Sequence, residues 1–370
     1  MSKRNRSWST SAERREIVAA DVSSSDVSID RRSRSSAADG AMGADGALDA
    51  AAPSARIAVL ISAFNASSTI LETLEGFLQQ DLPSDQWEVV VVDDGSTDDT
   101  SIVVHSFIES HLPQGALVVM RHNVGAARGR SVARAHTEAP NILFFDADDV
   151  PSPDYIYAHL RALESADRDV MSYALVDTGY FAHLGPSHVV GGAVQKATVN
   201  TVLGEVPFAT GGTVALPSRL FDAVAGYDHA MLGCEDLDFS VRVWLAGTDL
   251  VMADGARCYY RQRSRLGQIY RQRVGYASSH ALLVKKYWSL LDPWRYGYWQ
   301  LRAIAQVPGQ LLAAVRNWFK GPEGKVLAVE QLGTFAGYAK GSWKHRIPVL
   351  HPWGRMIDPK AVAAVDASAY

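Results

Sequence analysis

Two apolar segments of this chain run directly into groups of carboxylates: Val89-Val90-Val91-Val92 is followed by Asp93-Asp94-Gly95-Ser96, and Leu143-Phe144-Phe145 by Asp146-Ala147-Asp148-Asp149. Burying an unpaired carboxylate is costly, so acidic groups at the ends of buried strands require a cation or a polar ligand. In open α/β sheets, ligands bind just outside the carboxyl ends of the strands, and an Asp-x-Asp sequence there suits a divalent cation that also contacts phosphates. Either group alone is also compatible with a turn and a helix cap, but together they predict a site for a metal ion and a diphosphate.

Alternating strands and helices are predicted from Arg56 onward. Short apolar strands separated by amphipathic helices are typical of a mostly parallel sheet that helices cover on both faces. The fold class is therefore α/β. The predicted strands are residues 57–62, 88–92, 116–120 and 141–145, and the predicted helices are residues 69–80, 97–111, 125–138 and 153–166.

The following region is expected to continue the sheet with shorter strands. Within residues 169–216, the pairs Gly191-Gly192 and Gly211-Gly212 interrupt the apolar segments, which indicates a mixed, partly antiparallel arrangement. Residues 235–246 have the apolar spacing of a helix. Amphipathic helical segments rich in Arg, Tyr and Trp follow over residues 267–344.

Composition divides the 370-residue chain into three parts. Residues 1–54 are rich in Ser, Ala, Asp and Arg with few large apolar side chains, so we expect a disordered tail. Residues 55–262 are predicted to form the α/β domain, and residues 263–370 a mainly helical extension. A hydrophobic fraction of 47% supports a substantial core.

The net charge of -4 conceals a basic C-terminal region. Between Arg257 and Lys344 there are fifteen Lys and Arg residues against three acidic residues, which indicates either an anionic partner or an ordinary solvated surface. We expect neither a secretory signal nor a transmembrane helix, because no apolar run is long enough. Cys234 and Cys258 are too few for a disulfide framework or a zinc site, so we expect buried thiols in a reducing compartment.

The common phosphate-binding loops are not found in this sequence. No Gly-x-Gly-x-x-Gly follows the first predicted strand, and no Gly-Lys-Ser or Gly-Lys-Thr loop occurs. These absences disfavour a Rossmann dinucleotide site and a Walker phosphate loop. A metal ion at the carboxylates is the remaining way to hold phosphates.

Read in order, the motifs of the chain resemble glycosyltransferase family 2, the inverting enzymes with a GT-A fold. The likeness covers about residues 56–260 and implies a mixed, mostly parallel sheet flanked by helices, with the C-terminal helices outside the matched part. The motifs that carry it are Ile61–Asn65, Val91–Thr100, Asn123–Arg130, Phe145–Asp149, and Gly226–Asp228 leading to Glu235–Phe239 and Arg242.

The resemblance implies which residues bind the nucleotide of the donor. Asn65 and Asp93 would line the pocket for the nucleobase and ribose, with Asp94 next to it. Arg128 would lie near the nucleotide, where a guanidinium can bridge ribose or phosphate oxygens. A surface role is the alternative for Arg128.

The resemblance also implies the metal site and the proton acceptor. Asp146 and Asp148 would serve the sugar nucleotide and its Mg2+ or Mn2+, with Asp148 as the direct ligand. Asp236 would remove the proton from the acceptor hydroxyl, beside Glu235, although acidic residues in a first helical turn also simply complement the helix dipole. Asp238 is expected to bind a neighbouring residue or the acceptor.

Several positions have alternative interpretations. Gly211 and Gly212 fit a close backbone approach to the donor or acceptor, or else a strand bulge. Arg130 and Arg134 are interpreted as surface charges. The tryptophans after Gly267 either pack helices onto the sheet or contact an anionic membrane or a lipid-linked acceptor.

The predicted function is transfer of one sugar from a nucleotide-diphospho-sugar to an acceptor hydroxyl, in the synthesis of cell-surface polysaccharide, glycolipid or a related glycoconjugate. The expected acceptor is a saccharide or a lipid-linked molecule. We expect no nucleic-acid partner. The segment Gln268–Gln272 lacks the tryptophan of the Gln-x-x-Arg-Trp motif found in processive members, which disfavours a processive synthase. The chain is expected to be cytoplasmic. The C-terminal helices are expected either to contact the cytoplasmic membrane face peripherally or to form a homo-oligomer. The alternatives are a sugar-nucleotide pyrophosphorylase and a catalytically silent scaffold.

Overall fold

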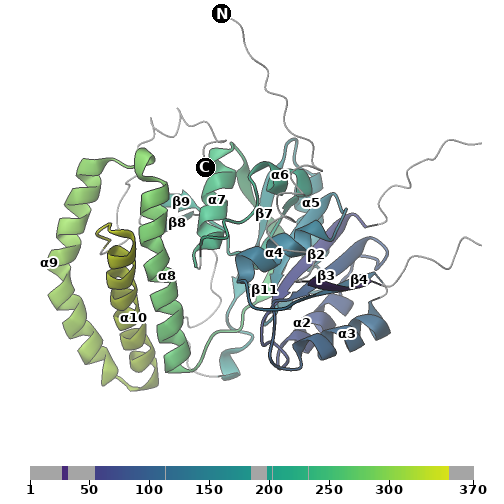
Figure 1. The fold of residues 1–370 in the computed structure, drawn as a ribbon, viewed down its shortest axis with the longest axis horizontal. Coiled ribbons are helices and arrows are strands. Elements are labelled where there is room, and N and C mark those ends of the chain that lie inside the picture. The colour runs from purple at the N-terminus through teal and green to yellow at the C-terminus, as the bar shows by residue number, and fades with distance from the viewer. Residues whose placement is uncertain are drawn as a thin grey trace, which may run out of the picture.

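The chain forms a mixed sheet with helices on both faces, beside a group of C-terminal helices (Figure 1). The strands are β1 (Val27–Arg31), β2 (Ile57–Ala63), β3 (Trp87–Asp93), β4 (Gly115–Met120), β5 (Asn141–Asp146), β6 (Val150–Pro151), β7 (Val170–Asp177), β8 (Thr198–Thr201), β9 (Gly204–Pro207), β10 (Val214–Pro217) and β11 (Asp249–Tyr259). The computed structural model describes residues 27–31, 55–112, 114–184, 198–201, 203–231 and 233–349.

The helices alternate with the strands in the first part of the chain and follow one another in the last. They are α2 (Ile70–Leu78), α3 (Thr100–His111), α4 (Ala126–Ala135), α5 (Tyr155–Glu164), α6 (Ser218–Ala223), α7 (Glu235–Leu245), α8 (Leu266–Lys286), α9 (Pro293–Trp318) and α10 (Gly321–His345). Short 3-10 segments lie at residues 182–184 and 288–290.

The described part of the chain forms a main sheet in the order β1-β4-β3-β2-β5-β10-β7-β11-β6. Strands β4, β3, β2 and β5 are parallel. Strand β10 pairs antiparallel with both β5 and β7, and β11 pairs parallel with β7. The predicted α/β class and the partly antiparallel continuation are confirmed; Gly191-Gly192 lie outside the described residues.

Alternate residues of the central strands pack on opposite faces of the sheet, as the two-residue period of a strand requires. On one face, side chains such as Val59 and Phe145 pack against α2, α3 and α5. On the other face, Leu60 and Phe144 pack against α4, α6 and α7. Because both faces are covered, the strands are continuous apolar runs that end where the polar residues begin.

One part of the predicted N-terminal tail is ordered in this structure. Residues Val27–Arg31 form β1, which pairs antiparallel with β4 from Val27↔Met120 to Arg31↔Ala116. These five residues lie within residues 1–54, the stretch for which the sequence predicts a disordered tail. A strand at a sheet edge leaves a row of unpaired backbone groups, which a short extended segment can satisfy. The rest of residues 1–54 lies outside the described residues.

The C-terminal helices share a core with the α/β part. Leu237 and Val241 lie on one side of α7. They pack with Val284 of α8, with Tyr287 directly after α8, and with Tyr338 of α10. Helices α8 and α10 approach closely: a Cβ added at Gly337 would lie 2.6 Å from Ala277 Cβ. The predicted helices after Gly267 are confirmed, and α7, which carries the proposed proton acceptor, contacts them.

Candidate active site

The carboxylates at the end of β3 accept hydrogen bonds from backbone amides of the neighbouring loops. Both carboxylate oxygens of Asp94 accept at 2.8 Å, one from Val124 N and one from Gly125 N, at the start of α4. Asp93 Oδ1 accepts from Ser96 N at 2.9 Å. Burial raises the pKa of Asp94, and the two amides oppose that effect. Asp94 therefore fixes the loop before α4.

Asn65 organises the neighbouring loop at the end of β2. Its Oδ1 accepts from Thr97 N at 2.8 Å, and its own backbone N donates to Ser96 Oγ at 2.9 Å. The φ of Asn65 is 50°, in the left-handed region that Asn tolerates. Gly95 has a φ of +71°, and a Cβ there would lie 2.5 Å from the His122 carbonyl carbon. The loops that carry Asn65 and Asp93 are thus joined at the predicted nucleotide pocket.

Arg130 connects the end of β5 to the start of α7. Its Nη2 lies 2.7 Å from Asp146 Oδ1, and its Nη1 lies 3.3 Å from Glu235 Oε1. The guanidinium also sits over the ring of buried Tyr227, 5.3 Å from its centroid. Two acidic residues that lie 89 positions apart in the sequence are therefore held by one buried cation.

The expectation that Arg130 and Arg134 are surface charges is wrong. Both are buried, with relative exposures of 5% and 6%. Arg134 pairs with Asp222 at 2.7 Å and has a structural role. The helical period gave a usable signal: these arginines follow Ala127 by three and seven residues and so share its buried side of α4.

Gly211 and Gly212 allow the acidic residues to approach the loop before β10. A Cβ at Gly212 would lie 2.4 Å from Asp146 Oδ2, and one at Gly211 would lie 3.2 Å from Asp236 Cβ. Gly211 N also donates to Asp236 Oδ2 at 3.4 Å. The two glycines thus leave room for Asp146 and Asp236 beside the loop before β10, and their approach to a donor or acceptor stays a prediction.

Asp236 is a half-buried residue in the first turn of α7. Burial and the adjacent Glu235 raise its pKa to about 7, while Arg130 and the amides of Leu237 and Gly211 act in the opposite direction. Leu237 N donates to Asp236 Oδ1 at 2.8 Å. The residue before the helix, Cys234, has a left-handed φ of 57°. Its surroundings and Glu235 thus favour the protonated form of Asp236, whereas Arg130 favours the carboxylate.

Asp148 and Asp149 follow β5 in different environments. The Asp148 side chain is exposed, and the surrounding protein together with the negative charge of Asp146 raises its pKa. Asp149 is buried, and its Oδ1 accepts from Arg261 N at 2.8 Å. The guanidinium of Arg261 donates hydrogen bonds to the carbonyl oxygen of Asp148 and to the carboxylate of Glu72. It also lies 3.9 Å from the ring centroid of Phe181. Asp149 therefore anchors the segment after β11 to the end of β5.

The carboxylates after β5 fit a divalent cation that is completed by a ligand. Within the residues that the structure describes, no group of three or more His, Cys, Asp or Glu side chains is arranged to hold a metal alone. Asp146 and exposed Asp148 are near enough for the charge of one to raise the pKa of the other. One or two carboxylates, with phosphates and waters supplying the remaining oxygens, are how Mg2+ is usually held.

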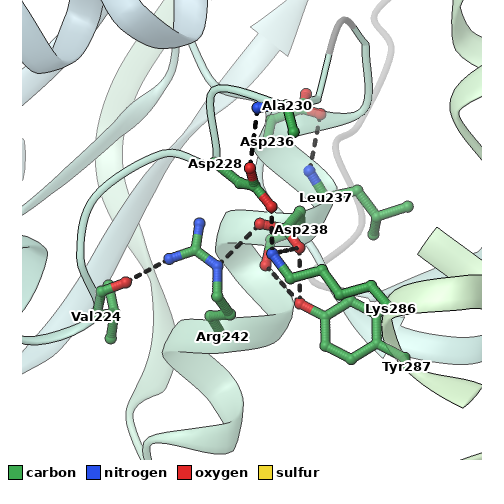
Figure 2. A network of polar contacts seen from close by, with 9 residues as sticks. All are labelled: Val224, Asp228, Ala230, Asp236, Leu237, Asp238, Arg242, Lys286 and Tyr287. Carbon is green, nitrogen blue, oxygen red and sulfur yellow. Dashed lines mark hydrogen bonds and ion pairs between the residues drawn. The ribbon is translucent and has the colours of Figure 1, made fainter. Parts of the chain in front are cut away.

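A buried ionic network fixes α7 behind the site (Figure 2). Asp238, with no exposed surface, lies 2.8 Å from Arg242 Nε and 2.8 Å from Lys286 Nζ. Lys286 also pairs with Asp228 at 2.6 Å, and Tyr287 OH donates to Asp238 Oδ1 at 2.8 Å. Asp238 therefore binds neighbouring residues, one of the two roles expected for it. Lys286 and Tyr287 lie at the end of α8, outside the motifs that the sequence singled out.

The remaining predicted residues also have defined positions. Arg128 is half-buried on α4, one residue before Gly129, where a Cβ would lie 2.2 Å from Ser62 Oγ of β2. The close contact with β2 holds this helix against the sheet. Cys234 and Cys258 are buried free thiols, as predicted.

Comparisons with known proteins give the chain its family. Residues 58–223 match the profile of "Glycosyl transferase family 2", and residues 141–330, just over half of the chain, match that of "Glycosyl transferase family group 2". The chain is 23% identical over 245 residues to the poly-beta-1,6-N-acetyl-D-glucosamine synthase of Staphylococcus epidermidis, covering 64% of this chain and 57% of that protein. The chain thus spans little more than half the length of this relative.

Two further likenesses agree with this result. Over 116 residues the chain is 33% identical to the poly(ribitol-phosphate) beta-N-acetylglucosaminyltransferase TarS of Staphylococcus aureus, covering 31% of this chain and 20% of TarS. The mannosyltransferase PcManGT of Pyrobaculum calidifontis, solved with GDP-Man and Mn2+, superimposes with a TM-score of 0.55 at 19% identity, covering 79% of this chain and 90% of that one. The latter likeness shows a fold of GT-A type. From these matches, the chain belongs to glycosyltransferase family 2.

Proposed function

We propose that this chain transfers one sugar from a nucleotide-diphospho-sugar to an acceptor hydroxyl, with inversion at the anomeric carbon. The observation that carries the proposal is the contact chain from Asp146 through Arg130 to Glu235, with Asp236 beside it at Gly211. It joins residues proposed for the donor to the residue proposed as the base. The ordered family motifs support the same assignment.

Asp236 is proposed as the general base. A base works best when its pKa lies near the working pH, and burial raises the pKa of Asp236 to about 7. As the acceptor oxygen forms its bond to the anomeric carbon, Asp236 takes the hydroxyl proton. The bond from that carbon to the phosphate oxygen breaks, and its electron pair leaves with the nucleoside diphosphate.

Arg130 is proposed to hold the two halves of the site in register. It binds Asp146 and Glu235 simultaneously, and its charge lowers the pKa of Asp236 against the effect of burial. Without this cation, three carboxylates in one region would repel one another and take up protons. Arg130 thus keeps Asp236 available as a base.

Asp148 and Asp146 are the residues that would hold Mg2+ or Mn2+. When bound, the cation would supply charge neutralisation for the leaving diphosphate. The open, exposed carboxylate of Asp148 and the donor set of oxygen ligands fit such an ion. The structural neighbour PcManGT was solved with Mn2+ and GDP-Man, which supports this choice.

The nucleotide is proposed to lie over the loops after β2 and β3 and the start of α4. Asn65 and Asp94 are engaged with backbone amides, so we assign them chiefly to shaping the pocket. Asp93 accepts an amide hydrogen bond through Oδ1, whereas Asp94 uses both oxygens, so Asp93 and Arg128 are the proposed direct contacts. An acidic side chain can accept from a nucleobase N–H, and a guanidinium can bind phosphate.

The acceptor is proposed to be a saccharide or a lipid-linked saccharide in cell-surface polymer synthesis. Two relatives are named as a poly-beta-1,6-N-acetyl-D-glucosamine synthase and a poly(ribitol-phosphate) beta-N-acetylglucosaminyltransferase. Their names also make nucleotide-diphospho-N-acetylglucosamine a first class of donor to test. Membership of a transferase family favours transfer over a pyrophosphorylase or a silent scaffold.

The proposal is tested by incubating the chain with a panel of nucleotide-diphospho-sugars and saccharide acceptors. Release of nucleoside diphosphate is measured with Mn2+, with Mg2+ and with a chelator. We expect metal-dependent release that requires acceptor and yields a product of opposite anomeric configuration, seen by NMR. Product that retains the donor configuration, or pyrophosphate made from sugar 1-phosphate and nucleoside triphosphate, would contradict the proposal.

A further inference from the structure

Helix α9 has a wide apolar face that no described part of the chain covers. Trp294, Leu301, Leu312 and Phe319 each expose at least 69% of their surface. They are spaced by seven, eleven and seven residues, each close to a whole number of turns at about 3.6 residues per turn. The four side chains therefore form one line along α9 and Phe319, the residue that directly follows its last turn. Further exposed apolar residues on α9 are Tyr298, Ile304, Leu311, Val315 and Trp318.

The opposite side of α9 attaches it to the rest of the protein. Tyr296, Gln300, Ala303 and Ala314 are buried, and α9 packs against α10, which lies between α9 and α8 (Figure 1). The helix is therefore held as an outer layer. Its exposed line is not the side used for folding onto α10.

The charges of α9 are all of one sign. Residues 293–318 contain three arginines and no Asp or Glu. Arg295, Arg302 and Lys320 directly follow Trp294, Leu301 and Phe319, so the exposed cations flank the apolar line along its length. These cations are local in their contacts: Arg295 pairs with Asp292, and Arg302 lies over Trp299.

We propose that this face of α9, the line Trp294–Phe319 with its flanking cations, docks on a membrane surface that contains anionic lipids. Apolar and aromatic side chains beside Lys and Arg are the pattern of a helix lying in the plane of the bilayer interface. Cations at that depth meet lipid phosphates, and tryptophan favours the same boundary. Among the helices that the structure describes, none has the length and hydropathy of a membrane span.

A second copy of the chain is a poorer occupant of this face. Two α9 helices packed through their apolar lines would bring rows of cations together without an acidic residue on either helix. Like charges at such a contact are unfavourable. Anionic lipid satisfies both the apolar line and the cations.

The test is sedimentation of the full 370-residue chain with vesicles of phosphatidylcholine and phosphatidylglycerol, and with phosphatidylcholine alone. We expect binding to the anionic vesicles that weakens as salt is raised. The double variant Leu301→Glu/Leu312→Glu should reduce the partition constant about tenfold or more. The variant Arg302→Gln/Lys320→Gln should reduce binding to anionic vesicles and leave the weak binding to neutral vesicles unchanged.

Ile102→Glu is the matched control, because Ile102 on α3 is 66% exposed and Leu301 is 69% exposed. It should bind vesicles like the unmodified chain, and circular dichroism should show that all variants fold. The proposal is overturned if the unmodified chain does not bind anionic vesicles, or if Leu301→Glu/Leu312→Glu binds them as well as the unmodified chain does. It is also overturned if sedimentation equilibrium shows that the unmodified chain is a dimer and this variant a monomer. The measurement uses neither donor nor acceptor, so it fails or succeeds independently of the proposed transfer reaction.

Discussion

Arg130 Nη2 donates to Asp146 Oδ1 across 2.7 Å, so a buried guanidinium of α4 holds the carboxylate that ends β5. The same guanidinium reaches Glu235 at the start of α7. Acidic residues of two distant motifs therefore meet at one cation. This relationship turns a set of separate sequence signals into a single site.

Replacing Arg130 by Met should reduce transfer about 100-fold, because it leaves Asp146 and Glu235 without their shared cation. Arg130 also lowers the pKa of Asp236, so the variant should need a higher pH for activity. The unmodified chain should lose kcat/KM as the pH falls below about 7, where Asp236 takes up a proton. The measurement is the pH profile of kcat/KM, with Arg130→Lys as a partial rescue. An acidic limb at the same pH in Arg130→Met would contradict this role.

Asp148→Ala should remove the metal dependence of donor binding. With Mn2+ present, the affinity should fall about tenfold or more, because Asp148 is the proposed direct ligand. Calorimetry with and without a chelator measures this difference. Asp85→Ala is the control, since Asp85 is exposed and precedes β3, at the opposite end of that strand from Asp93. Equal metal-dependent binding by Asp148→Ala and Asp85→Ala would reject the ligand assignment.

Gly212→Ala should disturb the site without a change of charge. The added Cβ would lie 2.4 Å from Asp146 Oδ2, so the carboxylate or the loop must move. We expect a loss of about 1–3 kcal/mol in the free energy of unfolding and weaker donor binding. Gly267→Ala has no atom within 4 Å of its added Cβ and should be nearly neutral in both assays. Normal donor binding by Gly212→Ala would show that this close approach is dispensable.

Lys286→Met should weaken the attachment of α7 to the C-terminal helices. Lys286 bridges buried Asp238 and Asp228, and removing a partner from a buried ion pair costs about 3 kcal/mol. Chemical denaturation should show this loss, and kcat should fall because α7 carries Asp236. The adjacent Lys285 is exposed, so Lys285→Met should match the unmodified chain. Equal free energies of unfolding for Lys286→Met and Lys285→Met would show that Lys286 does not stabilise the attachment of α7.

Much of the fold was predictable because the central strands are continuous apolar runs. The predicted strand 57–62 corresponds to β2, and the predicted helix 235–246 corresponds to α7. By contrast, β11 was not predicted: its 11 residues include Gly255 and show no regular alternation of burial. Short β6 is formed by Val150-Pro151, and two residues carry no periodic signal.

The sequence predicted that the carboxylates of the site lie close together, but it did not predict which cations pair with them. Strands β3 and β5 are parallel with β2 between them, so the carboxylates at their carboxyl ends had to share one edge of the sheet. A sequence does not show which side chain is buried among them, so Arg130 was assigned to the surface although it is 5% exposed. Lys286 was missed for a similar reason, because its partners Asp228 and Asp238 come from positions 58 and 48 residues earlier.

The most direct test of the central claim is a paired measurement on Asp236→Asn: donor binding by calorimetry and sugar transfer under the same conditions. We expect donor affinity to stay within about twofold, because the proposed nucleotide and metal contacts are unchanged, and transfer to fall by about 10³-fold, because the base is lost. Transfer near the unmodified rate, with normal donor binding, would contradict the account.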